Sequence, residues 1–426
     1  MDRDDAVDAR ISREVHVDKS FRNGYSLFRR DELSGTRLGC PSKCPGKCWV
    51  SACPDANGKE MTRMAVSSGN VRADGAQQVM PFDGGPLRAL YIGGTGTISA
   101  SCVRLSVEAG MEVSVLNRGR NRAQRELPSS VTQLVADVKN DSSVKAVLEG
   151  HDFDSVVNFL SYDADDALRW ASLLRGRVRQ YVHISSASLY GKPVKRVPIV
   201  ESTPLHNKFL EYARAKLRAE RALQASFSED GFPVTIVRPS HTYDDAQPPL
   251  PGDWTMMDRI ARGAEIPVHG DGSSLWTLTH AEDFAQGLVG LLGNTAAIGE
   301  AFHVTSDDVM TWDQIYTVLG EALGVEVKLV HLASELFPVI PPDWFCSDLI
   351  VGALSHCAVF DNSKIRRYVP GFCPKLTFQR SALRLAKWRQ EHPELARADP
   401  AVNGVLDRLV GGYHGAREVC ASWRVN

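Results

Sequence analysis

The sequence predicts an α/β fold built on a doubly wound parallel sheet, and two observations lead to it. Short β-branched runs alternate with amphipathic segments from residue 87 to about 238. A glycine-rich loop, YIGGTGTIS, joins the first of these runs to the first helical segment. Strand, helix, strand at this spacing implies parallel strands with helices on both faces. Such sheets bind ligands at the carboxyl ends of their strands, where the strand order reverses.

The expected elements follow in order along the chain. Strands are predicted at Leu87–Ile92, Glu112–Leu116, Gln133–Ala136, Ser155–Phe159, Tyr181–Ile184 and Val234–Val237. Helices are predicted from Val103 to Ala109, stopped by Gly110, and at 142–150, 163–174 and 211–226. After Arg238 the pattern becomes irregular and rich in proline, with a strand-like EAFHVT, a helix at 311–324 and a final amphipathic helix from Phe378 to about Gln390.

Three parts of the chain follow from this pattern. Residues 1–86 carry no sustained period and are expected to form a poorly structured, flexible N-terminal extension. Residues 87–238 are expected to bind a dinucleotide, and residues 239–426 to form a smaller substrate-binding lid, with some segments (about 265–305) returning to the sheet. The extension contains a C-x3-C-x3-C-x4-C run that could gather thiolates around zinc, although it lacks paired C-x2-C spacing. A metal site and flexible polypeptide both stay open for Cys40, Cys44, Cys48 and Cys53, and no metal is assigned.

Composition and charge argue against several classes of protein, including membrane-spanning and secreted ones. The chain has 426 residues, 43% hydrophobic and 23% charged, as an ordinary globular protein has, and a formal net charge of -2. That charge gives no global reason to expect nucleic acid or an anionic membrane as a partner. No apolar run approaches the ~20 residues of a membrane span, and the amino terminus lacks the apolar segment of a secretory signal. We therefore expect a cytoplasmic protein with reduced cysteines.

The glycine-rich loop predicts a Rossmann-type dinucleotide site. Gly93 would allow the tight turn, and Gly96 would let the backbone approach a pyrophosphate at the amino terminus of the following helix. Ser99 stands at the third small position. The residues expected to contact the cofactor are Gly93, Gly94, Thr95, Gly96, Thr97, Ile98, Asn117, Arg118, Asp137, Val138, Phe159 and Lys216.

The end of the second strand bears on the choice between NAD and NADP. Asn117 stands where an Asp or Glu would bind the adenosine ribose hydroxyls of NAD, and Arg118 could bind a 2′-phosphate by a charge-assisted fork. This favours NADP over NAD. The alternative is that the arginines are simply a solvated basic loop, comprising Arg118, Arg120, Arg122 and Arg125. Asp137 could hold the adenine amino group or be an ordinary surface residue.

A catalytic group is predicted at the fifth strand and the helix that follows it. Ser186 lies in ISSASLYG, and Tyr212 and Lys216 stand four residues apart on the expected helix, so that they share one face. The ammonium would stabilise a tyrosinate, which could pass a proton to or from an alcohol. Ser186 would hydrogen-bond the reacting oxygen.

With these motifs in order, residues 87 to about 390 resemble the extended short-chain dehydrogenase/reductase family, also called the NAD-dependent epimerase/dehydratase family. IGGTGTIS matches TGGTGFIG, SSASLYG with YARAK matches the Ser/Tyr/Lys triad, and RPSHTYD matches RPxNVYG. GDGSSLWTLTHAEDFA is similar to GDGxxxRDFxHVxDxA, and FDNSKIRRYVPGF to FDxSKAxRELGW. The resemblance implies NAD(P)-dependent hydride transfer and a homodimer formed through the helix that carries the tyrosine and its neighbour.

Two departures concern the substrate. An Arg of the RDF motif grips the substrate diphosphate in similar sugar-nucleotide epimerases, whereas that position is Trp276 here, and the Asn of the NVYG turn is His241. Both are expected to bind substrate, together with Ser186 and Ser240, although a structural role fits each equally well. No Asp-Glu pair follows Ser186, so dehydration lacks its proton donor.

Two functions remain open from sequence. The first is reversible hydride transfer at a secondary alcohol of a sugar-like or other small substrate, as an epimerase or a reductase. The second is a non-catalytic dinucleotide-sensing or RNA-binding protein on the same fold. The basic runs RGRNRAQR and RGRVR lack the interleaved aromatic residues that RNA recognition favours, so nucleic acid is the less expected partner.

Overall fold

The computed structural model describes residues 85–119, 125–339, 344 and 346–423. The predictions for the N-terminal extension, apart from Gly85 and Pro86, and for its cysteine run lie outside the described residues. So do those for Arg120 and Arg122.

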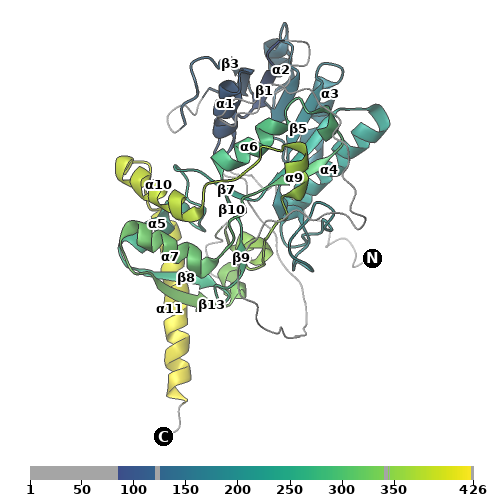
Figure 1. Cartoon of the computed structure of the whole chain (residues 1–426). Helices are drawn as coiled ribbons and strands as arrows, with labels where there is room; N and C mark the ends of the chain where they lie inside the picture. The colour runs from purple at the N-terminus through teal and green to yellow at the C-terminus, as the bar shows by residue number, and fades with distance from the viewer. Residues whose placement is uncertain (1–84, 120–124, 340–343, 345, 424–426) are drawn as a thin grey trace, which may run out of the picture.

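A seven-stranded sheet forms the upper part of the molecule (Figure 1). All of its neighbouring strands run parallel. The strand order is β11-β6-β5-β4-β1-β2-β3, so β1 lies between β2 and β4. In chain order these strands are β1 (Arg88–Ile92), β2 (Glu112–Asn117), β3 (Thr132–Val135), β4 (Ser155–Asn158), β5 (Gln180–Ile184), β6 (Val234–Pro239) and β11 (Ala301–Val304).

Helices cover both faces of the sheet, because the central strands are apolar on both sides. On β5, Val182 and Ile184 pack toward α1 (Ser99–Glu108) and α6 (Ala281–Leu291). Tyr181 on the same strand packs toward the opposite layer. That layer consists of α2 (Asp141–Leu148), α3 (Ala164–Leu174) and α4 (Glu211–Asp230). The predicted fold class, a doubly wound parallel sheet, is confirmed.

The smaller part lies below the sheet and contains three short strand pairs (Figure 1). They are β7 (His241–Tyr243) with β10 (Leu278–His280), β9 (Leu275–Trp276) with β12 (Met310–Thr311), and β8 (Glu265–His269) with β13 (Lys328–Leu332). Its helices include α5 (Asp253–Ala261), α7 (Trp312–Leu323), α8 (Cys346–Leu349), α9 (Ser363–Tyr368), α10 (Phe378–Glu391) and α11 (Pro400–Ser422). Of these, α9 packs its Ile365 against the sheet layer of α1 and α6.

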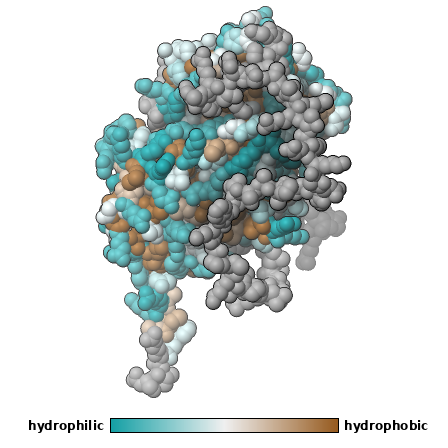
Figure 2. Space-filling view, viewed as in Figure 1, coloured by the Kyte–Doolittle hydropathy of each residue, from teal (hydrophilic) through white to brown (hydrophobic). Residues whose placement is uncertain are grey.

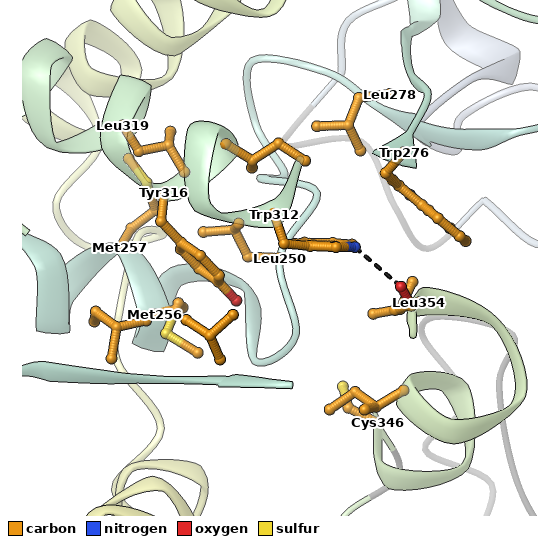
Figure 3. Packing of buried hydrophobic residues seen from close by; sticks show 14 of the residues in the cluster. Leu250, Met256, Met257, Trp276, Leu278, Trp312, Tyr316, Leu319, Cys346 and Leu354 are labelled. Atoms are coloured by element: carbon orange, nitrogen blue, oxygen red, sulfur yellow. Dashed lines mark hydrogen bonds between the residues drawn. The ribbon is translucent and has the colours of Figure 1, made fainter. Parts of the chain in front are cut away.

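The smaller part has its own apolar core, centred on Trp312 (Figure 3). Trp312 is fully buried, and its indole Nε1 donates to the carbonyl oxygen of Leu354 at 3.1 Å. Tyr316 and Leu319 follow on the same helix and pack against Met257 of α5. This core holds the strand that carries Trp276 in place.

Several helices differ from the sequence prediction, which did not include α5, α6, α8 or α9. α1 begins at Ser99, four residues before the expected Val103, because the chain becomes helical directly after the glycine loop. α11 was not predicted, and Phe378–Glu391 is therefore not the final helix. The sequence of α11 has four glycines and buries only Val405, Leu406, Leu409 and Val410 along one narrow stripe, so neither propensity nor periodicity indicates it. Its last turns are exposed and stand clear of the molecule (Figure 2).

Among the described helices, none combines the length and the apolar character needed to cross a membrane.

A buried ion pair ties α4 to the sheet. Arg238 of β6 donates from Nε and Nη2 to the two carboxylate oxygens of Glu220, at 2.9 and 2.6 Å. The side chains are 3% and 1% exposed. This bidentate pair holds the helix that carries Tyr212 and Lys216 at a defined distance from the strand.

We predict that Glu220→Gln lowers the free energy of unfolding by about 3–5 kcal/mol, because it leaves a buried guanidinium without its counter-charge. Glu211→Gln on the same helix is the matched control, since Glu211 pairs with Arg214 and Arg218 at the surface, and should cost less than about 1 kcal/mol. Urea unfolding of both variants measures the difference. Equal losses would contradict the assigned role of the pair.

Candidate functional site

The glycine loop, Gly93–Ser99, leaves the carboxyl end of β1 in a tight turn. Gly93 has φ +87°, and a Cβ there would lie 2.7 Å from Leu160 Cγ. A Cβ on Gly94 would lie 2.7 Å from a methyl group of Val115 on β2. Among the described residues, a Cβ at Gly96 would meet only the Ser99 hydroxyl, at 3.3 Å, and would otherwise have open space around it. The first two positions therefore require glycine for packing, while the third leaves room for a ligand.

The loop lies where the strand order reverses. The chain continues from β1 into α1 on one face of the sheet and from β4 toward α3 on the other. In doubly wound sheets the ligand-binding crevice lies at such a change of side, here at the carboxyl ends of β1 and β4. Gly93 contacts this second segment through Leu160. Ser99, 1% exposed, accepts a hydrogen bond from the Gly96 N–H at 2.8 Å and begins α1 beside the crevice.

The remaining residues expected at the cofactor surround the same edge. Thr95 and Ile98 are half-buried in the turn, and Val138 is buried after β3. Phe159 stacks on Tyr91 with ring centroids 6.3 Å apart.

Polar groups line the ends of β2 and β3. Asn117 accepts a hydrogen bond from Gly119 N–H at 2.7 Å. Arg118 is exposed, as is Asp137, whose carboxylate accepts from Lys139 N–H at 3.1 Å. The structure thus leaves the Arg118 side chain in reach of solvent at the end of β2.

Arg125 does not belong to a solvated basic loop. Its Nε and Nη2 donate to the Asp244 carboxylate at 2.5 and 3.0 Å, and the two side chains are only 12% and 11% exposed. Thr97 of the glycine loop donates to Gln247 Oε1 at 2.6 Å. The segment that follows β7 is therefore joined to the dinucleotide side of the crevice by two polar contacts.

Lys216 lies buried at the carboxyl ends of β4 and β5. Its Nζ donates to the carbonyl oxygens of Ser161 at 2.6 Å and Ile184 at 2.8 Å. Burial lowers the pKa of Lys216 to about 7, against the weaker opposing attraction of Glu220. Ser161, which accepts a hydrogen bond from this ammonium, directly follows Leu160, the residue that lies against Gly93 of the glycine loop. Tyr212, one helical turn earlier on α4, is half-buried.

Two buried hydroxyls near Lys216 find no hydrogen-bond partner among the described residues. They are the Oγ atoms of Ser161 and Ser185, which are shielded from solvent, although buried polar groups are normally hydrogen-bonded. Ser161 also supplies one of the carbonyls that bind Lys216, and Ser185 follows Ile184, which supplies the other. Together with the open face at Gly96, these unpaired groups fit a polar ligand that spans from the glycine loop to Lys216.

Ser186 opens onto a separate pocket between the sheet and the smaller part. It begins the short helix η1 (Ala187–Leu189), and its Oγ accepts from Ser188 N–H at 3.1 Å and donates to Ser188 Oγ at 2.9 Å. The pocket holds about 460 Å³, open solvent at its mouth included. Its lining residues include Ser186, Ser240, His241 and Trp276, the four side chains that the sequence predicts to bind substrate, whereas Tyr212 and Lys216 are absent from the described lining.

His241 presents a neutral ring to this pocket. Burial lowers the pKa of His241 to about 4. Its Nδ1 accepts a hydrogen bond from the Trp276 indole N–H at 3.1 Å, and because an indole only donates, the His241 proton must reside on Nε2. Of the two nitrogens, Nε2 is therefore the one that can donate to a substrate oxygen.

The pocket also contains a residue that the sequence did not indicate. Lys192 is 7% exposed and lies with its Nζ 5.6 Å from the Trp276 ring centroid. In the sequence it is one of several lysines and arginines in a polar loop after Gly191. Only the family motif directly before it, SSASLYG, could have drawn attention to the position.

Asp245, His280 and Glu282 gather outside this pocket in an arrangement that could hold a metal ion. Arg384 already donates to the carboxylates of both Asp245 and Glu282, at 2.7 and 2.5 Å. The positive charge of Arg384 offsets the charges of the two carboxylates, so these residues form an ion-pair network.

The chain matches a known protein family and resembles several known proteins. The family model described as NAD dependent epimerase/dehydratase family matches residues 89–305. The chloroplast stem-loop binding protein of 41 kDa b from Arabidopsis thaliana is 27% identical over 262 residues, which cover 59% of this chain and 67% of that protein. A dTDP-glucose 4,6-dehydratase of an Actinoplanes species is 26% identical over 162 residues, 38% of this chain and 50% of that protein. The chain thus spans from half to two thirds of the length of these relatives.

Among solved structures, UDP-glucose 4-epimerase from Bifidobacterium longum, in complex with NAD+ and UDP, has a TM-score of 0.58 at 18% identity. The likeness covers 72% of this chain and 99% of that one. At this identity it establishes the shared fold.

We predict that Gly94→Ala destabilises the protein by about 1–3 kcal/mol and weakens dinucleotide binding, because the added methyl group must displace Val115 and with it the turn. Gly411→Ala is the matched control: nothing lies within 4 Å of a Cβ there, and alanine favours a helix over glycine. Urea midpoints and nucleotide titrations measure both effects. An unchanged midpoint for Gly94→Ala would refute the close packing of the loop.

Proposed function

This chain belongs to the NAD-dependent epimerase/dehydratase family, whose enzymes are of the extended short-chain dehydrogenase/reductase type, and from that premise we propose that it catalyses reversible hydride transfer at a secondary alcohol or ketone. The substrate is a sugar-like or other small molecule. One observation carries the proposal: Lys216 lies buried at the ends of β4 and β5. There it donates to the carbonyl oxygen of Ser161, whose neighbour Leu160 packs on the glycine loop. A cation so placed suits chemistry at that crevice.

In this proposal one region of the chain binds the cofactor and another binds the substrate. The glycine loop and the amino terminus of α1 would hold the pyrophosphate, and Lys216 would bind the nicotinamide ribose. When bound, the nicotinamide supplies the hydride acceptor and donor. The smaller part, residues 239–426, would close over the substrate from the opposite side, with Trp276 and His241 facing it.

Proton transfer falls to Tyr212. A protonated Lys216 would favour the tyrosinate form by attraction, so that the phenol could take a proton from the alcohol or return it. Ser186 would donate its hydroxyl proton to the reacting oxygen, replacing its present bond to Ser188. Epimerase and reductase cycles use these same groups: an epimerase would keep the ketone bound as an intermediate and reduce its other face, whereas a reductase would take up a ketone and release the alcohol.

Tyr212→Phe should reduce turnover by about 10²–10⁴-fold while nucleotide is still retained, because only the transferable proton is lost. The assay denatures purified protein to identify released nucleotide, then screens sugars and ketones for a change in cofactor absorbance. Tyr413→Phe on α11 is the control and should keep full activity. Equal turnover by wild type and Tyr212→Phe would remove Tyr212 from the mechanism.

The cofactor preference is a separate proposal: the chain uses NADP in preference to NAD. Asn117 offers no carboxylate to a ribose 2′-oxygen, and the exposed Arg118 beside it can pair with a phosphate. Arg118→Ala should therefore weaken NADP binding by about 10-fold or more and NAD binding little. Titrations of both nucleotides measure the ratio, with Arg367→Ala on α9 as an exposed control. An unchanged ratio in Arg118→Ala would defeat the assignment.

We also propose a cytosolic homodimer that forms through α3 and α4. Apolar side chains stand exposed on these helices, with Leu168 at 45% and Phe227 at 37% exposure. Burying them against a second copy would stabilise the pair.

RNA binding is the second candidate, favoured by the name of the stem-loop binding relative. The structure supplies an argument against it, because the run RGRVR is engaged within the protein. Arg175 pairs with Asp230 at 2.9 Å, and Arg177 donates to the Leu148 carbonyl oxygen at 2.9 Å. Arginines so bound are less available to phosphates. Tight binding of stem-loop RNA without any released nucleotide would favour this candidate over the enzyme.

A further inference from the structure

The pocket beside Ser186 has one charged side chain in its described lining, and that charge is positive. Hydroxyl groups come from Ser186, Ser188 and Ser240. The apolar wall includes Leu349, Leu354 and Phe360, and the described lining residues include no carboxylate. The one charged side chain among these described lining residues is Lys192.

Lys192 has no counter-charge in the described part of the chain. Its Nζ donates to the carbonyl oxygen of Cys357 at 3.2 Å, and none of the ion pairs between described residues includes it. The titratable groups that face it are the Cys357 thiol and His356. Burial, together with the weaker repulsion from the nearby Lys192 charge, lowers the pKa of His356 to about 4, so that ring is neutral and offers no charge compensation at neutral pH.

An uncompensated ammonium in a buried pocket is costly unless a ligand supplies the missing charge. Burial lowers the pKa of Lys192 to about 8, so most of the side chain is still protonated at pH 7. An anion bound against Nζ would stabilise the protonated form and would itself gain a charge-assisted hydrogen bond. The pocket is thus electrostatically prepared for a negatively charged group.

We propose that Lys192 is a specificity-determining residue that binds a carboxylate or phosphate group of the substrate. The substrate is then a ring-shaped alcohol that carries an acidic group, with the ring against Trp276 and its hydroxyls bound by the serines and by His241 Nε2. The position of Lys192 next to Trp276 supports this geometry, since one ligand can contact both. This inference rests on the proposed function in taking the pocket as the substrate site.

The test uses binding of three probes to the full chain: D-glucuronate, D-glucose 6-phosphate and neutral D-glucose. At pH 7 we expect at least one anionic probe to bind wild type about 10-fold or more tightly than D-glucose. Lys192→Met should lose that advantage, and Lys192→Arg should keep it. Lys195→Met, which removes an exposed lysine from the same loop, is the matched control and should bind as wild type does. Which anion binds better separates the carboxylate from the phosphate.

The pH dependence gives an independent readout. The protonated ammonium is present below its pKa, so anion affinity in wild type should fall by about 10-fold per pH unit above pH 8 or somewhat higher, because the anion itself raises that pKa. In Lys192→Arg the affinity should stay level there, since a guanidinium remains charged. Equal affinity for all three probes, or equal anion affinity in wild type and Lys192→Met, overturns the proposal.

A further variant separates this proposal from the one on which it rests. Tyr212→Phe should bind the anionic probe as wild type does. If Tyr212→Phe also keeps full turnover, the proposed chemistry fails while the anion site stands. If Lys192→Met changes no probe affinity and Tyr212→Phe loses turnover, the anion site fails and the chemistry stands.

Discussion

The ammonium of Lys216 lies between two carbonyl oxygens at the carboxyl ends of β4 and β5, and the geometry of the site depends on that burial. Burying this cation is costly, and the two carbonyl oxygens, the Tyr162 ring 4.7 Å away and the attraction of Glu220 offset part of that cost. The arrangement is maintained because α4 is also fixed to the sheet by the Arg238–Glu220 pair, one helical turn further along. Together the two contacts set the distance of Tyr212 from the crevice.

In the proposed mechanism, the crevice and the pocket serve as the cofactor side and the substrate side of one functional region. The glycine loop, Leu160 and Lys216 surround the dinucleotide side, where packing demands glycine at two positions and unpaired hydroxyls remain. Ser186 and the smaller part surround the substrate side, where the polar groups are hydroxyls, a neutral histidine and one lysine. The Thr97–Gln247 and Arg125–Asp244 contacts join the two sides, so a movement of the smaller part would also shift the glycine loop.

The departures from the family motif take on meaning in this setting. Trp276 stands where similar epimerases carry an arginine, and its indole orients His241 while its ring faces Lys192. A cation is therefore present in the pocket, supplied by a different segment of the chain. A point charge on a flexible stem suits one acidic group better than the forked grip of an arginine on a diphosphate.

The sequence by itself determined the fold class, the positions along the chain of the six strands from β1 to β6 and the location of the glycine loop, because strand and helix periods and glycine positions are local properties of the chain. The order of these strands in the sheet came only from the structure. Helix boundaries were less well determined, and α11 escaped detection because its stability comes from a narrow buried stripe instead of propensity.

What only the tertiary structure decided is which polar groups are paired. Arg125 was one of several arginines in a predicted basic loop and is half of a nearly buried ion pair, while Lys192, which no sequence pattern indicated, is the charged residue of the pocket lining. Burial and pairing arise between segments more than 100 residues apart, such as Lys192 and Cys357, and no local pattern encodes such contacts.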